Sequence, residues 1–156
     1  MIIFEDTRNQ MGKHDLKHEY FERNGIEIRR TKLYVGDYTL PFNQTICIDT
    51  KNSIQELIGD VQSDHERFRS EQNRAQEAGI KLIVLVENEH GYRCVDDVVG
   101  WINPNCRKTS RSIEGPRLAT AMKTMAERYG VRFEFCSPEE AGKRILQLLE
   151  VKDGRK

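Results

Sequence analysis

The stretch from Ile80 to Val86, Ile-Lys-Leu-Ile-Val-Leu-Val, is the feature that most limits how this chain can fold. Its residues are almost all apolar, which predicts a strand covered on both faces rather than one with a face in water. Such a strand lies in the middle of a sheet that carries helices on both sides. The run is far shorter than the roughly 20 apolar residues of a membrane-spanning helix. The sequence therefore predicts an α/β protein.

Periodicity on either side of this run predicts further elements. Strands are expected at 2–4, 26–28, 33–40, 45–49 and 131–135. Helices are expected at 13–23, 53–61, 62–78, 95–101, 116–129 and 138–149. An exposed loop is expected at 103–112. Because 33–40 and 45–49 flank a turn, they predict a hairpin. The predicted fold class is α/β, with three α/β/α layers around a mixed central sheet. One domain is expected over 1–151, followed by a flexible tail at 152–156.

Overall charge and cysteine spacing exclude several classes of protein. The 25 basic and 25 acidic residues leave no net charge, which argues against a protein that coats nucleic acid nonspecifically. The four cysteines are scattered, so neither a disulfide framework nor a zinc ribbon is supported. The first residues lack the pattern of a signal peptide, so we expect an intracellular, cytoplasmic protein. Without a glycine-rich phosphate-binding motif, a nucleotide-binding regulator is the weaker hypothesis.

Basic residues concentrate in one later segment. Between residues 105 and 132 there are seven basic and two acidic residues. Arg107, Lys108 and Arg111 lie in the expected loop and are candidates for contacting a nucleic-acid backbone. A solvated loop and helix face would give the same pattern, so charge alone leaves both interpretations open.

The two arms of the expected hairpin carry most of the chemistry. Asp37 lies on the first arm, and Asp49 and Lys51 lie on the second. Side chains two apart in a strand share a face, so Asp49 and Lys51 point to the same side, where Asp37 can join them. Carboxylates hold Mg²⁺ or Mn²⁺, which polarises a phosphate and lowers the pKa of an attacking water. A lysine then positions or deprotonates that water, or offsets charge in the transition state. This pattern favours phosphodiester cleavage.

In these residues the sequence resembles the XPF-type nuclease domain, a branch of the PD-(D/E)XK nucleases that includes the archaeal Hef nuclease. The resemblance is carried, in the family's order, by Asp6-Thr7-Arg8-Asn9, Val35-Gly36-Asp37-Tyr38, Asp49-Thr50-Lys51, Glu56-Leu57, the stretch 67–72 and Val84-Leu85-Val86-Glu87. It covers about residues 1–90. It implies a restriction-endonuclease-like fold and a metal-dependent DNA endonuclease.

The same resemblance implies roles for individual residues. The implied catalytic residues are Asp37, Asp49, Lys51 and Asp6, the last for metal or for orienting the site. The implied ligands of Mg²⁺ or Mn²⁺ are Asp37, Asp49 and the carbonyl of Thr50. The implied DNA contacts are Arg8, Arg67 and Gln72.

The chain departs from the family pattern at two positions. Asp49-Thr50-Lys51 stands where the family has Glu-Arg-Lys, which keeps the carboxylate and the lysine but loses the arginine, and Asn9 replaces a glutamate. The alternative function is therefore a catalytically weak or inactive DNA-binding or scaffolding module of the same fold. The expected partners are DNA and a second copy of the chain in a homodimer, with no membrane and no small-molecule cofactor. Flap, fork and branched substrates stay open, as do roles in DNA repair, recombination and phage DNA processing.

Overall fold

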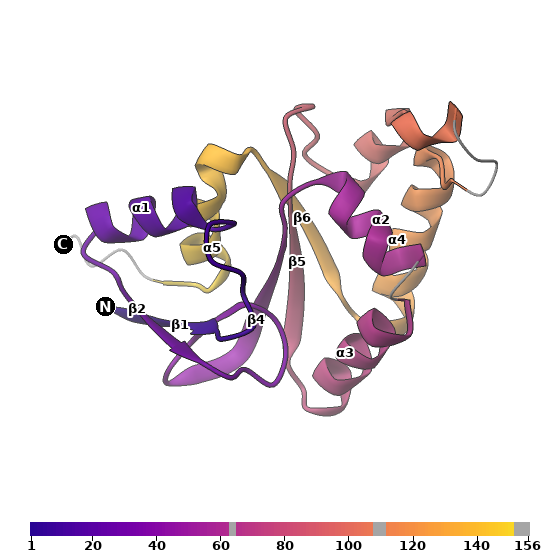
Figure 1. The fold of residues 1–156 in the computed structure, drawn as a ribbon. Coiled ribbons are helices and arrows are strands. Elements are labelled where there is room, and N and C mark those ends of the chain that lie inside the picture. The colour runs from indigo at the N-terminus through magenta and orange to yellow at the C-terminus, as the bar shows by residue number, and fades with distance from the viewer. Residues whose placement is uncertain (63–64, 108–111, 152–156) are drawn as a thin grey trace.

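A mixed β-sheet forms the centre of the molecule (Figure 1). The computed structural model describes residues 1–62, 65–107 and 112–151. Within these ranges the strands are β1 (Ile2–Asp6), β2 (Glu27–Thr31), β3 (Tyr38–Leu40), β4 (Asn43–Lys51), β5 (Lys81–Glu87) and β6 (Arg132–Cys136). They form a six-stranded sheet in the order β2-β1-β3-β4-β5-β6. The pairs β1–β2, β4–β5 and β5–β6 are parallel, whereas β3 runs antiparallel to both β1 and β4. The predicted mixed sheet is confirmed.

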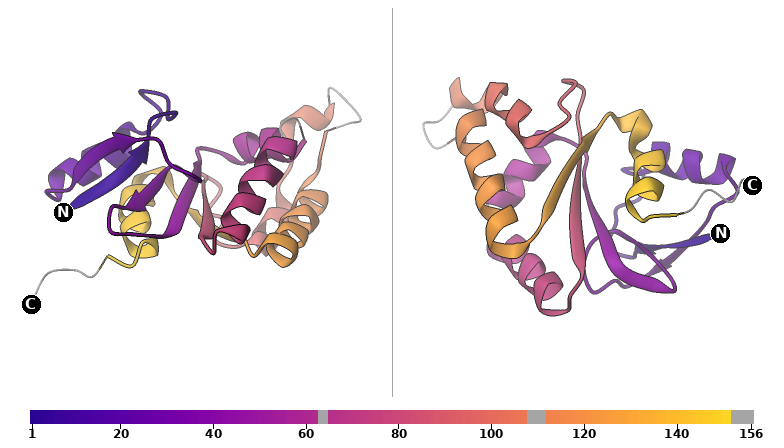
Figure 2. Two further views of the ribbon diagram at one scale, coloured as in Figure 1. Left: turned by 90° about the horizontal axis from the view of Figure 1, so that it is seen from below. Right: turned by 180° about the vertical axis from the view of Figure 1, so that it is seen from behind.

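Helices cover both faces of this sheet. They are α1 (Asp15–Arg23), α2 (Ile54–Gln62), α3 (His65–Glu77), α4 (Gly115–Tyr129) and α5 (Ala141–Leu148), with short 3₁₀ helices η1 (Val95–Gly100), η2 (Pro104–Arg107) and η3 (Pro138–Glu140). Figures 1 and 2 show α1 and α5 on one face and α2, α3 and α4 on the other. No helix among the described residues is long and apolar enough to cross a membrane. The three-layer α/β/α arrangement is thus the one expected.

Three segments differ from the sequence prediction. The strand expected at 33–40 is limited to β3, because residues 33–37 form a bend in which the N–H groups of Gly36 and Asp37 donate to Glu71 and to the Ile48 carbonyl. The expected loop at 103–112 begins with η2, where the Asn103 side chain accepts a hydrogen bond from the N–H of Asn105. The last predicted helix is split into η3 and α5. Its first turn is tightened by Ser137, whose N–H donates to the Glu140 carboxylate. The differences at η2 and η3 arise from local side-chain bonds that hydrophobic periodicity does not detect.

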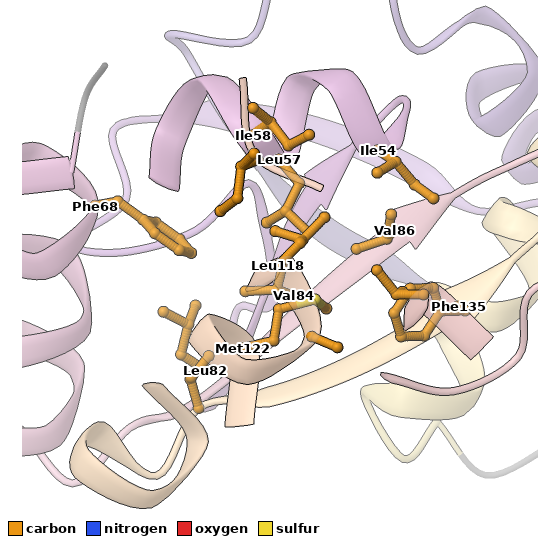
Figure 3. Close-up of a cluster of buried hydrophobic side chains, with 14 of the residues drawn as sticks. Ile54, Leu57, Ile58, Phe68, Leu82, Val84, Val86, Leu118, Met122 and Phe135 are labelled. Carbon is orange, nitrogen blue, oxygen red and sulfur yellow. The ribbon is translucent and has the colours of Figure 1, made fainter. Parts of the chain in front are cut away.

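The strand β5 divides the apolar interior into two clusters. Leu82, Val84 and Val86 face α2, α3 and α4 (Figure 3), whereas Ile83 and Leu85 face α1 and α5. All five side chains are buried. This alternation explains why the strand is apolar at almost every position, and it confirms that β5 is covered on both faces.

A substitution at Leu118 tests the packing of the larger of these two clusters. This leucine is fully buried on α4 and packs in the cluster shown in Figure 3. Leu118→Ala is expected to lower the free energy of unfolding by about 2–5 kcal/mol, because it removes apolar contacts and leaves a cavity. Thr120→Ala on the exposed side of the same helix is the control, with an expected change of about 0.5 kcal/mol or less. Urea unfolding measures both, and equal effects would show that α4 is not packed as described.

Candidate active site

A glycine turn places Asp37 beside β4. Gly36 has a φ of +74°, in the left-handed region that favours glycine. A Cβ at this position would lie 2.9 Å from the carbonyl oxygen of Ile48. The Gly36 N–H donates to Glu71 Oε1 at 2.8 Å, and the Asp37 N–H donates to the Ile48 carbonyl at 2.6 Å. The turn is therefore fixed to both β4 and α3, which accounts for the Gly-Asp pair of the sequence.

The carboxylate of Asp37 is oriented by Thr50. The Thr50 N–H and hydroxyl both donate to Asp37 Oδ2, at 2.8 and 2.6 Å. Desolvation raises the pKa of Asp37 to about 6, although the bonds from Thr50 and the charge of Lys51 oppose the shift. A cation bound nearby would stabilise the charged form of this carboxylate.

Lys51 lies between two carboxylates. Its Nζ is 2.9 Å from Asp49 Oδ2, as the shared strand face predicts, and it also forms an ion pair with Asp60 of α2. The ammonium lies 5.4 Å from the centroid of the Phe68 ring. Burial alone would lower the pKa of Lys51, because it disfavours the charged ammonium. The negative charges of Asp49 and Asp60 have a larger opposite effect, so the pKa of the lysine is raised. Burial also raises the pKa of Asp49 well above its usual value, against the attraction of Lys51.

These groups line a cavity of about 250 Å³ that β4 shares with α2, α3 and the end of β1. Its acidic lining residues are Asp6, Asp37, Asp49, Glu56, Asp60 and Glu71. Its lysine and arginine lining residues are Arg8, Lys13, Lys51, Arg67 and Arg74. The cavity thus offers oxygen ligands for a cation together with positive side chains for a phosphate backbone.

Asp6 lines the cavity, but both of its oxygens have partners. Asp6 Oδ1 accepts the N–H of Leu33 at 2.9 Å, and Oδ2 accepts Arg8 Nε at 2.6 Å. Arg8 also donates to the Leu33 carbonyl at 3.1 Å. Asp6, proposed from the sequence as a catalytic residue, therefore holds Arg8 and the loop before Gly36 in place. This geometry fits a positioning role.

The helix α3 turns Arg67, but not Gln72, toward the cavity. Gln72 is only 2% exposed, and its amide donates to the Phe68 carbonyl within the helix. A DNA contact by Gln72 is incompatible with this burial, and the proposal for this residue is corrected. Its neighbour Glu71 lines the cavity instead, together with Arg74.

The three remaining candidates for DNA contact are Arg107, Lys108 and Arg111 of the loop expected at 103–112. Lys108 and Arg111 lie outside the described residues, and so does the side chain of Arg107, whose backbone ends η2. A backbone-binding role for this loop stays a prediction. The expected tail at 152–156 also lies outside the described residues.

The tyrosine of the Val-Gly-Asp-Tyr segment does not line the cavity and packs in the core with Ile3 and Phe21. The buried Tyr38 hydroxyl donates to Glu5 Oε2 at 2.8 Å and lies 2.9 Å from His14 Nδ1. Burial, together with Glu5, raises the pKa of Tyr38, so the phenol stays protonated. Tyr38 therefore anchors β3 to β1 and α1, and its role is structural.

The donor set fits a hard divalent cation. Asp37 and Asp49 are desolvated carboxylates that repel one another, which a bound cation would offset. Within the described ranges, no group of three or more His, Cys, Asp or Glu side chains is arranged so that it could hold a metal ion. Magnesium sites commonly use one or two carboxylates, with waters and substrate phosphates as the other ligands. Asp37, Asp49 and the Thr50 carbonyl are the residues that would hold the ion.

The mixed six-stranded sheet with helices on both faces is consistent with the restriction-endonuclease-like fold. A family model described as the ERCC4 domain matches residues 6–149. The chain therefore belongs to the ERCC4 domain family, and the resemblance to the XPF-type nuclease domain is confirmed.

Comparison with solved structures supports the fold. XPF from Aeropyrum pernix is 19% identical with a TM-score of 0.67, and the match covers 97% of this chain and 64% of that one. XPF from the same organism in complex with DNA is 19% identical with a TM-score of 0.64, covering 99% of this chain and 69% of that one. This chain thus spans less than two thirds of the first of these relatives. None of the curated proteins matches the chain.

Proposed function

We propose that this chain is a DNA endonuclease that depends on Mg²⁺ or Mn²⁺ and cuts DNA where strands branch or separate. The observation that carries the proposal is the convergence of Asp37, Asp49 and Lys51 in one cavity that also bears basic side chains. The structure of a related XPF with DNA supports the choice of DNA as the partner. Flaps and forks are the proposed substrates, and repair, recombination and phage DNA processing are the proposed settings.

Five residues of the cavity lining, Asp37, Asp49, Thr50, Lys51 and Arg67, have a part in this reaction. A bound divalent ion would polarise the scissile phosphate and lower the pKa of the attacking water. Asp37, oriented by Thr50, and Asp49 would hold that ion. Lys51 presents its ammonium beside Asp49, where it offsets the charge that develops on the phosphate. Arg67 on the cavity rim is placed to bind the DNA backbone.

The proposal is tested by cleavage of a labelled panel of flap, forked, single-stranded and duplex DNA. The wild type is expected to cut branched substrates with Mg²⁺ or Mn²⁺ and to lose activity in EDTA. Lys51→Ala is expected to slow single-turnover cleavage by about 10²-fold or more. The matched control is Lys81→Ala, an exposed lysine at the start of β5, which should cleave at the wild-type rate.

Two results would contradict the proposal in different ways. Cleavage that persists in EDTA would show that the reaction does not depend on a divalent metal ion. Binding of branched DNA without cleavage, at any metal concentration, would favour the inactive DNA-binding module instead. The homodimer is a separate proposal, and sedimentation of the purified chain tests it.

A further inference from the structure

An exposed tyrosine lies on a firmly held loop next to the cavity. Tyr34 is 57% exposed, whereas its neighbours Leu33 and Val35 are buried. The loop is fixed before Tyr34 by the bonds of Leu33 to Asp6 and Arg8, and after it by the bond from Gly36 to Glu71. Tyr34 therefore holds its ring toward solvent on a rigid support, and burial in the core does not explain its presence.

The surroundings of this ring are basic. Arg8, Lys32, Leu33, Tyr34 and Arg74 line a groove of about 480 Å³. All three charged side chains that the described residues contribute to it are positive. The Arg74 guanidinium lies 5.8 Å from the centroid of the Tyr34 ring. The groove therefore combines an aromatic face with a local positive charge, in contrast to the mixed charge of the cavity.

The groove adjoins the cavity, because Arg8 and Arg74 line both. A DNA strand bound in the cavity can therefore continue along the groove past Tyr34. An aromatic ring with basic neighbours is the combination that binds single-stranded nucleic acid, since the ring stacks on a base and the cations hold the phosphate. Paired bases within a duplex are already stacked on one another and offer no free face to the ring.

We propose that Tyr34, with Lys32 and Arg74, binds an unpaired nucleotide of the DNA substrate beside the scissile phosphate. This inference rests on the proposed function and adds to it a binding site for the single strand, formed by the groove around Tyr34. Stacking on Tyr34 positions that strand, and the two cations bind its backbone.

The test measures binding separately from cleavage. A single strand with one 2-aminopurine base is titrated with wild-type protein in EDTA, and quenching of its fluorescence reports stacking on a ring. Tyr34→Ala is expected to abolish the quenching and weaken binding by about 5- to 150-fold. Tyr34→Phe should retain both. The matched control is Phe42→Ala, because Phe42 is fully exposed at the β3–β4 turn, outside the groove.

A second variant tests whether the positive charge of the groove contributes to binding of the strand. Lys32→Glu is expected to weaken binding of the same strand and to reduce its salt dependence. Equal affinity of wild type, Tyr34→Ala and Lys32→Glu would overturn the inference, and cleavage by that wild type would leave the nuclease proposal standing. Quenching that depends on Tyr34 in a protein that cuts nothing would support the groove and overturn the nuclease.

Discussion

Asp49→Asn is expected to reduce cleavage by about 10³-fold while leaving the fold at least as stable as the wild type. The loss of activity follows because an amide is a poor ligand for a hard divalent cation and carries no charge. The retained stability follows from burial, which raises the pKa of Asp49 and so disfavours its ionised form in the folded protein. Lys51 keeps an ionic partner in Asp60.

Two measurements on one preparation check this result. Single-turnover cleavage of a forked substrate with Mn²⁺ gives the rate, and thermal unfolding in EDTA gives the stability. Asp15→Asn, an exposed aspartate in the first turn of α1, is the control and should cleave at the wild-type rate. If Asp49→Asn unfolds at a clearly lower temperature, Asp49 supports the fold, and its loss of cleavage says nothing about metal binding.

The part of the site that lies on β4 could be predicted from strand geometry. The two-residue repeat of β4 places Asp49 and Lys51 on one face, and their 2.9 Å contact agrees with it. Gly36 adopts a positive φ, a backbone conformation that favours glycine, and Asp37 follows it directly. Strand periodicity and a positive φ are local properties, so a single sequence carries them.

The part contributed by the helices was harder to predict, and Gln72 shows why. Neighbouring residues on a helix differ in direction by about 100°, so an assignment that is wrong by one residue exchanges a cavity residue for a core residue. Phe68 and Ala75 are buried, and Gln72 lies between them at helical spacing. Glu71 lies at helical spacing from the same two residues and lines the cavity. Spacing alone therefore does not decide which of residues 71 and 72 is buried.

Other contacts had no sequence signal. Asp60 is nine residues beyond Lys51, on a helix whose angle to β4 depends on tertiary packing. Thr50 was expected to offer a carbonyl, and its two donors to Asp37 were missed. Side-chain bonds of this kind depend on the loop geometry, which is visible only in three dimensions.

A buried ion pair joins α1 to the end of β5. Lys17 is 2% exposed, and its Nζ lies 2.6 Å from Oε2 of the buried Glu87, although the two residues are 70 positions apart. Burial raises the pKa of Glu87, and the nearby Lys17 opposes the shift. A lysine on a polar helix resembles a surface residue in the sequence, so the pair could not be predicted.

Lys17→Met is expected to lower the free energy of unfolding at pH 8 by about 3–5 kcal/mol, because Glu87 is left charged and buried without a partner. Without Lys17, the pKa of Glu87 in the folded protein rises further above its unfolded value. A carboxyl with a raised folded pKa adds stability below its unfolded pKa, and that stability is lost as pH rises through the folded pKa. The deficit of Lys17→Met should therefore be smaller at pH 5 than at pH 8.

Urea unfolding at both pH values measures the deficit, with Lys143→Met on the exposed side of α5 as the matched control. The double variant Lys17→Met, Glu87→Leu removes both charges and should recover most of the lost stability, since apolar groups of similar size can replace a buried pair at little cost. If the double variant is no more stable than Lys17→Met, the loss comes from packing around the lysine stem, and the charge left on Glu87 is not its cause. An unchanged deficit between pH 5 and pH 8 would lead to the same conclusion, because only a titrating Glu87 makes the effect depend on pH.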